Sequence, residues 1–186
     1  MFSEQKVAII TGASQGIGAG AVQAYRKLGY AVVANSQHIT SSGDPGVLTV
    51  PGDIADPETG AGLVDRAVER FGRVDTLVNI STSLVDHANT AVPSALASLT
   101  KGGLNAVTRS LAIEYAGSGV RVNTVSPGII RTPMHAEDAY DTLAALHPVG
   151  RMGDIGDIVE AIAYLETAEF VTGEILHVDG GQSAGH

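Results

Sequence analysis

The stretch that decides the fold is KVAIITGASQGIG, residues 6–18. Its first part, residues 6–11, is a short apolar run typical of a strand that is buried on both faces of a sheet. Its second part contains three glycines. Gly12 permits a tight turn, Gly16 lets backbone approach a pyrophosphate, and Gly18 lets the next helix pack closely. The stretch therefore predicts a strand, a glycine-rich turn and a helix arranged to bind a dinucleotide.

The helix that follows this turn strengthens the prediction. A helix N-terminus presents free N–H groups and the positive end of the helix dipole to an anion. The residues expected to hold the phosphates are Gly12, Ser14, Gln15, Gly16, Ile17 and Gly18. The alternative is a turn with a structural role only.

Outward from this stretch, short apolar runs alternate with helical patterns. Further strands are expected at residues 30–34, 47–50, 74–80, 120–125 and 174–178, and helices at 17–28, 56–71, 93–116 and from 154 onward. The helix at 93–116 places Leu104, Val107, Leu111 and Tyr115 on one face. Strand–helix alternation predicts an α/β fold with a doubly wound, Rossmann-like parallel sheet, in a single domain over residues 1–186. Residues 35–46 are too short and too rich in breakers for the connecting helix that is usual there.

Composition restricts the class of protein. The 186 residues carry a formal charge of −9, which argues against a nucleic-acid partner. No apolar run is long enough to cross a membrane, and no signal-peptide pattern is present, so we expect a cytoplasmic protein. There is no cysteine, and the six histidines lack the spacing of metal ligands, so no metal site is expected.

The spacing Gly-x-x-x-Gly-x-Gly resembles that of the short-chain dehydrogenase/reductase family. Further motifs match in the same order along nearly the whole chain. They are Asp53-Ile54, residues 75–79 (DTLVN), Lys101, residues 121–128 (RVNTVSPG) with Ile130 and Thr132, and residues 171–181 (VTGEILHVDGG).

The resemblance implies an NAD(P)-dependent oxidoreductase acting on a carbonyl or alcohol of a small molecule. Its implied catalytic residues are Ser83, which polarises the substrate oxygen, and Lys101, which binds the ribose. Its implied cofactor contacts beyond the glycine-rich turn are Ser36, Asp53, Ile54, Asn79, Lys101, Pro127, Gly128, Ile130 and Thr132. It also implies a substrate lid at residues 132–147 and a homo-oligomer formed through the long helix and the C-terminal strand.

The chain departs from the family in length. Only 22 positions separate Asn79 from Lys101, where the family places a further helix and strand. Residues 78–83 resemble a fusion of the strand before this module with the strand after it. We therefore expect one βα unit fewer than usual, without the family's catalytic asparagine and half of a dimer interface. An alternative is that residues are absent from the recorded chain at this point.

The chain also departs from the family in chemistry. Ala97 stands where the family has a tyrosine four residues before the lysine. A phenol beside an ammonium group can exchange a proton with a carbonyl or alcohol, whereas alanine cannot. Two alternatives remain open. One is a slow reductase that draws its proton from water or from His87, and the other is a catalytically silent dinucleotide-binding protein acting as a partner subunit or sensor.

Cofactor choice depends on the end of the second strand, Asn35-Ser36-Gln37-His38. An acid there binds the ribose 2′-hydroxyl of NAD, and an arginine favours the phosphate of NADP. This sequence has neither. Because Ser36 and His38 are able to contact a phosphate, NADP is favoured and NAD is the alternative.

Overall fold

The computed structural model describes residues 5–54, 56–88, 90 and 92–185. The chain divides into two compact units, Met1–Leu77 and Val78–His186, which are described in turn. The single domain expected over residues 1–186 stays a prediction. Within the described residues, no helix combines the length and the apolar character needed to cross a bilayer.

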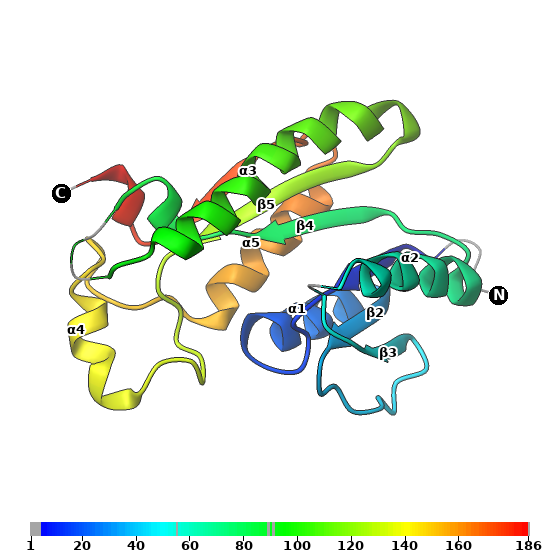
Figure 1. The fold of residues 1–186 in the computed structure, drawn as a ribbon, viewed down its shortest axis with the longest axis horizontal. Coiled ribbons are helices and arrows are strands. Elements are labelled where there is room, and N and C mark those ends of the chain that lie inside the picture. The colour runs from blue at the N-terminus through cyan, green and yellow to red at the C-terminus, as the bar shows by residue number, and fades with distance from the viewer. Residues whose placement is uncertain (1–4, 55, 89, 91, 186) are drawn as a thin grey trace. The chain divides into compact units, whose positions relative to one another are not determined.

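The first unit alternates strands and helices, as predicted (Figure 1). Its elements are β1 (Val7–Ile10), α1 (Gly16–Lys27), β2 (Ala31–Ser36), β3 (Val47–Pro51), α2 (Pro57–Phe71) and the start of β4 (Thr76–Ile80). The strands are parallel and pair in the order β3-β2-β1-β4. Their carboxyl ends therefore lie at one edge of the sheet, where parallel α/β sheets bind ligands.

The core of the first unit forms between this sheet and α2. On α2, the apolar residues Leu63, Ala67 and Phe71 recur at helical spacing and are buried against residues of β1 and β2. The expected helix ends are also present. The Asp56 carboxylate accepts the N–H of Glu58 at 3.0 Å, and Gly72 ends the helix in the left-handed conformation with φ 87°.

No helix lies between β2 and β3, as the breaker-rich sequence predicts. Instead, one ion pair ties this connection to α1. The Asp44 carboxylate accepts hydrogen bonds from Arg26 at 2.8 and 3.1 Å and from the Gly46 N–H at 2.8 Å. The hydrogen bond from Arg26 is the main reason why the pKa of Asp44 lies below its ordinary value.

The second unit continues the alternation. Its elements are the rest of β4, η1 (Ser83–Val85), α3 (Ala95–Tyr115), η2 (Ala116–Ser118), β5 (Arg121–Pro127), η3 (Glu137–Ala139), α4 (Tyr140–Ala144), α5 (Ile155–Thr167), β6 (Ile175–Val178) and η4 (Gln182–Ala184). β4, β5 and β6 follow one another in the sheet, so the full strand order is β3-β2-β1-β4-β5-β6. The predicted doubly wound parallel sheet with one βα unit fewer is confirmed.

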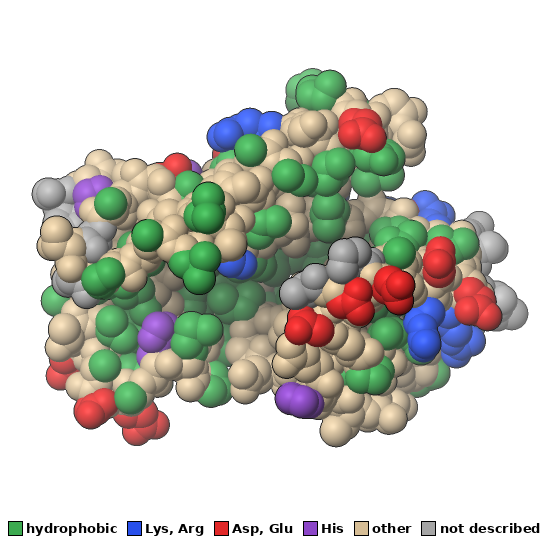
Figure 2. Space-filling model, viewed as in Figure 1, with side chains coloured by type: hydrophobic (Ala, Val, Ile, Leu, Met, Phe, Trp, Pro, Cys, Tyr) green, Lys and Arg blue, Asp and Glu red, His purple; other side chains and the backbone are tan. Residues whose placement is uncertain are grey.

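Helix α3 buries a polar face rather than its apolar one. It lies along β5 (Figure 1) and turns Asn105, Thr108 and Ala112 into the interior. On the predicted apolar face, Val107 is 47% and Tyr115 43% exposed. Figure 2 shows hydrophobic side chains on the surface over α3. The inner face is polar because Thr124 of β5 and Asn79 of β4 meet Thr108 there.

Candidate functional site

The glycine-rich turn has the geometry that its sequence predicts. Gly12 and Gly16 have φ angles of 64° and 56°, a conformation that side chains disfavour. A Cβ on Gly18 would lie 2.2 Å from the Gly12 carbonyl oxygen, so only glycine fits at this position. The backbone at the start of α1 therefore forms a tight cradle that requires glycine at these positions.

The N-terminus of α1 is open to an anion. Gln15 at the cap makes no capping hydrogen bond with its side chain, and the first turn carries no acidic residue. Ser14 and Gln15 are exposed. Because the first N–H groups of a helix have no partner within the helix, this end fits a diphosphate.

The ends of β2 and β3 lie beside this cradle. The Ala13 N–H donates to the Asn35 carbonyl at 2.9 Å, and the hydroxyls of Ser14 and Ser36 lie 3.0 Å apart. The buried Asn35 amide donates to the carbonyls of Val50 and Gly52 at 3.0 and 3.1 Å, which fixes the segment after β3. The structure thus brings Ser36 to the glycine-rich turn.

The residues expected to contact adenine follow β3 directly. Asp53 and Ile54 come after Gly52, whose N–H donates to the Ser36 carbonyl at 3.3 Å. Both side chains are exposed, Ile54 to 51%, although this residue is apolar. An exposed isoleucine at the ligand-binding edge of a sheet is suited to pack on a flat ring.

In the second unit, Lys101 lies at the carboxyl end of β4. Its ammonium group donates to the Ile80 carbonyl at 2.8 Å, and its own carbonyl accepts a hydrogen bond from the Ser81 hydroxyl at 3.3 Å. Desolvation by partial burial lowers the pKa of Lys101. Lys101 therefore lies where β4 ends, and its contact with a ribose stays a prediction.

Ser83 is buried and already hydrogen-bonded. Its side chain is 1% exposed, and its hydroxyl donates to the Gln182 amide oxygen at 2.7 Å. Among the described residues, the Gln182 amide nitrogen is buried without a hydrogen-bond partner. No local pattern indicates Gln182 as a partner of Ser83, because the two residues are 99 positions apart and belong to no shared motif.

Asn79 contacts the polar face of α3. Its amide donates to the Thr108 hydroxyl at 2.9 Å, and this hydroxyl lies 2.6 Å from that of Thr124. Asn79 thereby joins β4 to the helix that carries Lys101, and its expected contact with the cofactor stays a prediction.

The loop after β5 is held by a histidine that sequence reasoning missed. The Ile129 N–H donates to Nε2 of His147 at 2.9 Å, and the Nδ1 atom lies 3.0 Å from the Leu143 carbonyl, so Nδ1 carries the proton. A Cβ on Gly128 would lie 2.8 Å from His147 Nε2. In the sequence, the one signal that could have indicated a structural role for His147 is its position directly before Pro148 in an apolar stretch.

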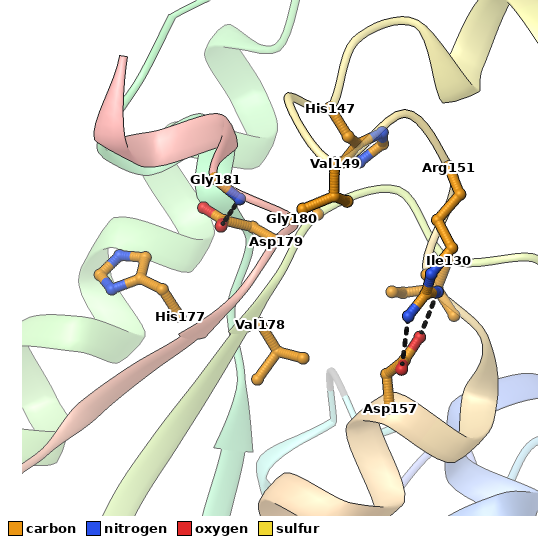
Figure 3. A pocket seen from close by; sticks show the side chains of 12 residues that line it. Ile130, His147, Val149, Arg151, Asp157, His177, Val178, Asp179, Gly180 and Gly181 are labelled. Atoms are coloured by element: carbon orange, nitrogen blue, oxygen red, sulfur yellow. Dashed lines mark hydrogen bonds and ion pairs between the residues drawn. The ribbon is translucent and has the colours of Figure 1, made fainter.

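A pocket of about 410 Å³ opens beside this loop (Figure 3). Its lining includes Gly128 and Ile130 from the loop, His147, Val149 and Arg151, and residues 177–181 from the end of β6. Arg151 donates to both carboxylate oxygens of Asp157 at 2.7 and 2.9 Å. That hydrogen bonding, with a further bond from the Asp154 N–H, lowers the pKa of Asp157 to about 2.

Asp179 anchors the C-terminal turn at the edge of this pocket. Burial acts to raise the pKa of Asp179, but hydrogen bonds from Ser183 and Gly181 and the nearby His177 outweigh it, so the pKa is lowered. The Gly181 and Ser183 N–H groups donate to its two oxygens at 2.9 and 2.8 Å. The turn that carries Gln182 is therefore fixed.

The expected lid, residues 132–147, contains η3 and α4. The Met134 N–H donates to the Thr132 hydroxyl at 3.4 Å, and Met134 is 85% exposed. The guanidinium of Arg131 lies 5.2 Å from the centre of the Tyr140 ring. The function of this segment as a lid stays a prediction.

Comparisons with known proteins match both halves of the chain. A family model described as "short chain dehydrogenase" matches residues 6–94, and one described as "Enoyl-(Acyl carrier protein) reductase" matches residues 80–183. A cis-4-hydroxycyclohexanecarboxylate dehydrogenase of Sinomonas cyclohexanicum is 32% identical over 97% of this chain and 97% of its own length. That alignment has 247 positions, so the relative carries residues that have no counterpart in the 186 of this chain.

Solved structures share the fold. A 3-ketoacyl-(acyl-carrier-protein) reductase from Brucella melitensis, complexed with NADH, has a TM-score of 0.81 at 25% identity and covers 96% of this chain and 98% of its own. A structure described as "ElxO with NADP Bound" has a TM-score of 0.87 at 23% identity and covers 97% of this chain and 100% of its own.

Proposed function

Because the chain belongs to the short-chain dehydrogenase/reductase family, we propose that it is an NAD(P)-dependent oxidoreductase that interconverts a carbonyl and an alcohol of a small molecule. Relatives support this substrate class, since their names include a hydroxycyclohexanecarboxylate dehydrogenase and a ketoacyl reductase. The net charge of −9 supports the expectation that nucleic acid is not a partner. We also propose, from the sequence, that the protein is cytoplasmic and has no membrane partner.

The observation that carries the proposal is the cradle at the start of α1. Gly12 and Gly16 adopt positive φ angles, and Gly18 has no room for a side chain. The proposed phosphate ligands are the backbone and side chains of Ser14, Gln15 and Ile17 together with these glycines. Asp53 and Ile54, exposed after β3, are the proposed contacts of adenine.

The second unit supplies the remaining proposed contacts. Lys101 would bind the ribose through one hydroxyl, and the proposed contacts of the nicotinamide half are Asn79, Pro127, Gly128, Ile130 and Thr132. A bound nicotinamide supplies or accepts the hydride. Ser83 is the proposed partner of the substrate oxygen. Since its hydroxyl donates to Gln182, Ser83 can engage a substrate only if that hydrogen bond rearranges.

NADP is the favoured cofactor because β2 ends in Ser36, a hydroxyl rather than a carboxylate, beside Ser14 of the glycine-rich turn. The hydroxyls of Ser36 and Ser14 lie 3.0 Å apart, and a hydroxyl can donate a hydrogen bond to a 2′-phosphate. Fluorescence titration should show tighter binding of NADPH than of NADH. Ser36→Asp should reverse this order, because a carboxylate repels the phosphate and accepts from the 2′-hydroxyl. Ser41→Asp, which adds the same charge at an exposed site in the same connection, is the control.

A second candidate function is cofactor binding without turnover, in a partner subunit or sensor. Ala97 at the tyrosine position and the buried, bonded hydroxyl of Ser83 favour it. The test is Ala97→Tyr, assayed with a panel of small ketones and aldehydes. If the wild type binds NADPH without turnover while the variant gains turnover, the silent function is correct. Turnover by the wild type supports the oxidoreductase.

A further inference from the structure

Lys101 is a half-buried ammonium group with hydrogen-bonding capacity to spare. It donates to the Ile80 carbonyl at 2.8 Å, and an ammonium has three N–H groups. Among the described residues, no carboxylate forms an ion pair with it. Desolvation disfavours the charged form of a lysine, so a half-buried ammonium without a counter-ion releases its proton more readily than an exposed one.

The serine hydroxyls of β4, η1 and α3 near Lys101 in the chain already donate hydrogen bonds to other groups. Ser83 donates to Gln182 at 2.7 Å, Ser81 to the Lys101 carbonyl at 3.3 Å, and Ser98 to the Leu84 carbonyl at 3.0 Å. One turn before Lys101, Ala97 contributes only a methyl group. In this part of the chain, the ammonium is therefore the group best able to release a proton.

The charged groups on the elements packed against α3 are engaged elsewhere. Asp86, which follows η1, pairs with His177 at 3.0 Å. Arg121, which begins β5, pairs with Glu166 at 3.6 Å. On α3 itself, Arg109, Glu114 and Tyr115 are exposed, and the titratable residue that follows η1 after Asp86 is His87. Desolvation is the cause of the lowered pKa of Lys101.

We propose that Lys101 is the catalytic acid and base of this chain and exchanges a proton directly with the substrate oxygen, the task for which the chain has no tyrosine. The inference rests on the proposed oxidoreductase function. In reduction, bound NAD(P)H would supply the hydride that the carbonyl carbon receives. The oxygen receives a proton as one N–H bond of the ammonium breaks and an O–H bond forms. The neutral amine then takes a proton from water, and in oxidation the transfer runs in reverse.

The first test needs no cofactor. The chain has only three lysines, Lys6, Lys27 and Lys101, so protein labelled with ¹³C at the lysine ε carbon gives three side-chain signals to follow by NMR. Lys101→Arg assigns the signal of interest. We expect Lys101 to titrate below the ordinary pKa of a lysine, because the group is desolvated. A midpoint at or above that ordinary value would overturn the proposal.

The second test distinguishes proton donation by Lys101 from the effect of its positive charge. Arginine keeps the positive charge but does not release its proton near neutral pH. Lys101→Arg should lower kcat for carbonyl reduction about 10²-fold or more, and the fall of kcat/KM at high pH should disappear. Lys27→Arg, at an exposed site on α1, should change neither. In Lys101→Ala, added ethylamine should restore part of the rate, whereas tetramethylammonium, which has no proton to give, should not.

The outcomes distinguish this inference from the proposed function. If the wild type turns over and Lys101→Arg keeps its rate and pH profile, Lys101 is not the acid and the proposed oxidoreductase stands. If the fall of kcat/KM at high pH disappears in His87→Gln rather than in Lys101→Arg, Lys101 is likewise not the acid and the proposed oxidoreductase stands. If the wild type binds NADPH and reduces no carbonyl at any pH, the proposed oxidoreductase function and this inference both fail.

Discussion

Gly18 is the residue whose replacement tests the cradle most directly. In Gly18→Ala the new Cβ would meet the Gly12 carbonyl oxygen at 2.2 Å, a backbone atom that cannot move without distorting the turn. We expect a loss of about 1–3 kcal/mol in the free energy of unfolding, from overpacking, and weaker NADPH binding. Thermal unfolding and fluorescence titration measure the two effects.

The matched control is Gly62→Ala on α2. A Cβ there meets nothing within 4 Å, and alanine favours a helix over glycine by about 0.5–1 kcal/mol. This variant should be as stable as the wild type or more so, with unchanged binding. Equal behaviour of the two variants would contradict the packing argument at Gly18.

Because of Asp157, the stability of the folded protein should depend on pH in the acid range. Its pKa is lowered from 3.8 to about 2 by Arg151 and by the Asp154 N–H. A carboxyl with a lowered folded pKa stabilises the protein above its unfolded pKa, and this contribution is lost as the pH falls from about 4 to about 2. The difference in Tm between the wild type and Asp157→Asn should therefore be largest above pH 5 and shrink over that range. A difference independent of pH would show that the charge is not the cause.

At the scale of elements, the polar interior of α3 makes Thr108 a structural residue. Its hydroxyl meets Asn79 at 2.9 Å and Thr124 at 2.6 Å, and the residue is fully buried. Thr108→Val should cost about 1–3 kcal/mol of stability, because it leaves buried polar groups without partners. Thr100→Val makes the same change on the exposed side of the same helix and should have little effect. Denaturant unfolding of both variants compares them.

The sequence predicts elements well where the signal is local. The helix ends at Asp56 and Gly72 and the glycine-rich turn depend on neighbouring residues, and the structure confirms them. The buried face of α3 was not predictable from its apolar periodicity, because partners on β4 and β5 decide which face turns inward. Likewise, the bond between Ser83 and Gln182 joins residues 99 positions apart, and no local pattern indicates it.

At the scale of the whole molecule, the outward apolar face of α3 supports the predicted homo-oligomer. Leu96, Leu99 and Ile113 on this helix are 73%, 74% and 82% exposed. Static light scattering should give a mass that is a multiple of 19.0 kDa. The double variant Leu99→Glu, Ile113→Glu should have a lower mass, whereas Phe170→Glu, at a fully exposed apolar residue after α5, should not. A monomer at high protein concentration would refute the prediction.

The connection between β2 and β3 makes the chain vulnerable at one place. Residues 37–43 are mostly exposed and without regular structure, and the ion pair of Arg26 and Asp44 holds only the end of the segment. A broad-specificity protease such as thermolysin should therefore nick the folded protein here early, as mass spectrometry of the fragments would show. Cleavage should be faster at high ionic strength, because salt screens a partly exposed ion pair. A bound nucleotide that touches Ser36 should slow it, so the rate of nicking would report ligand occupancy without any assay of turnover.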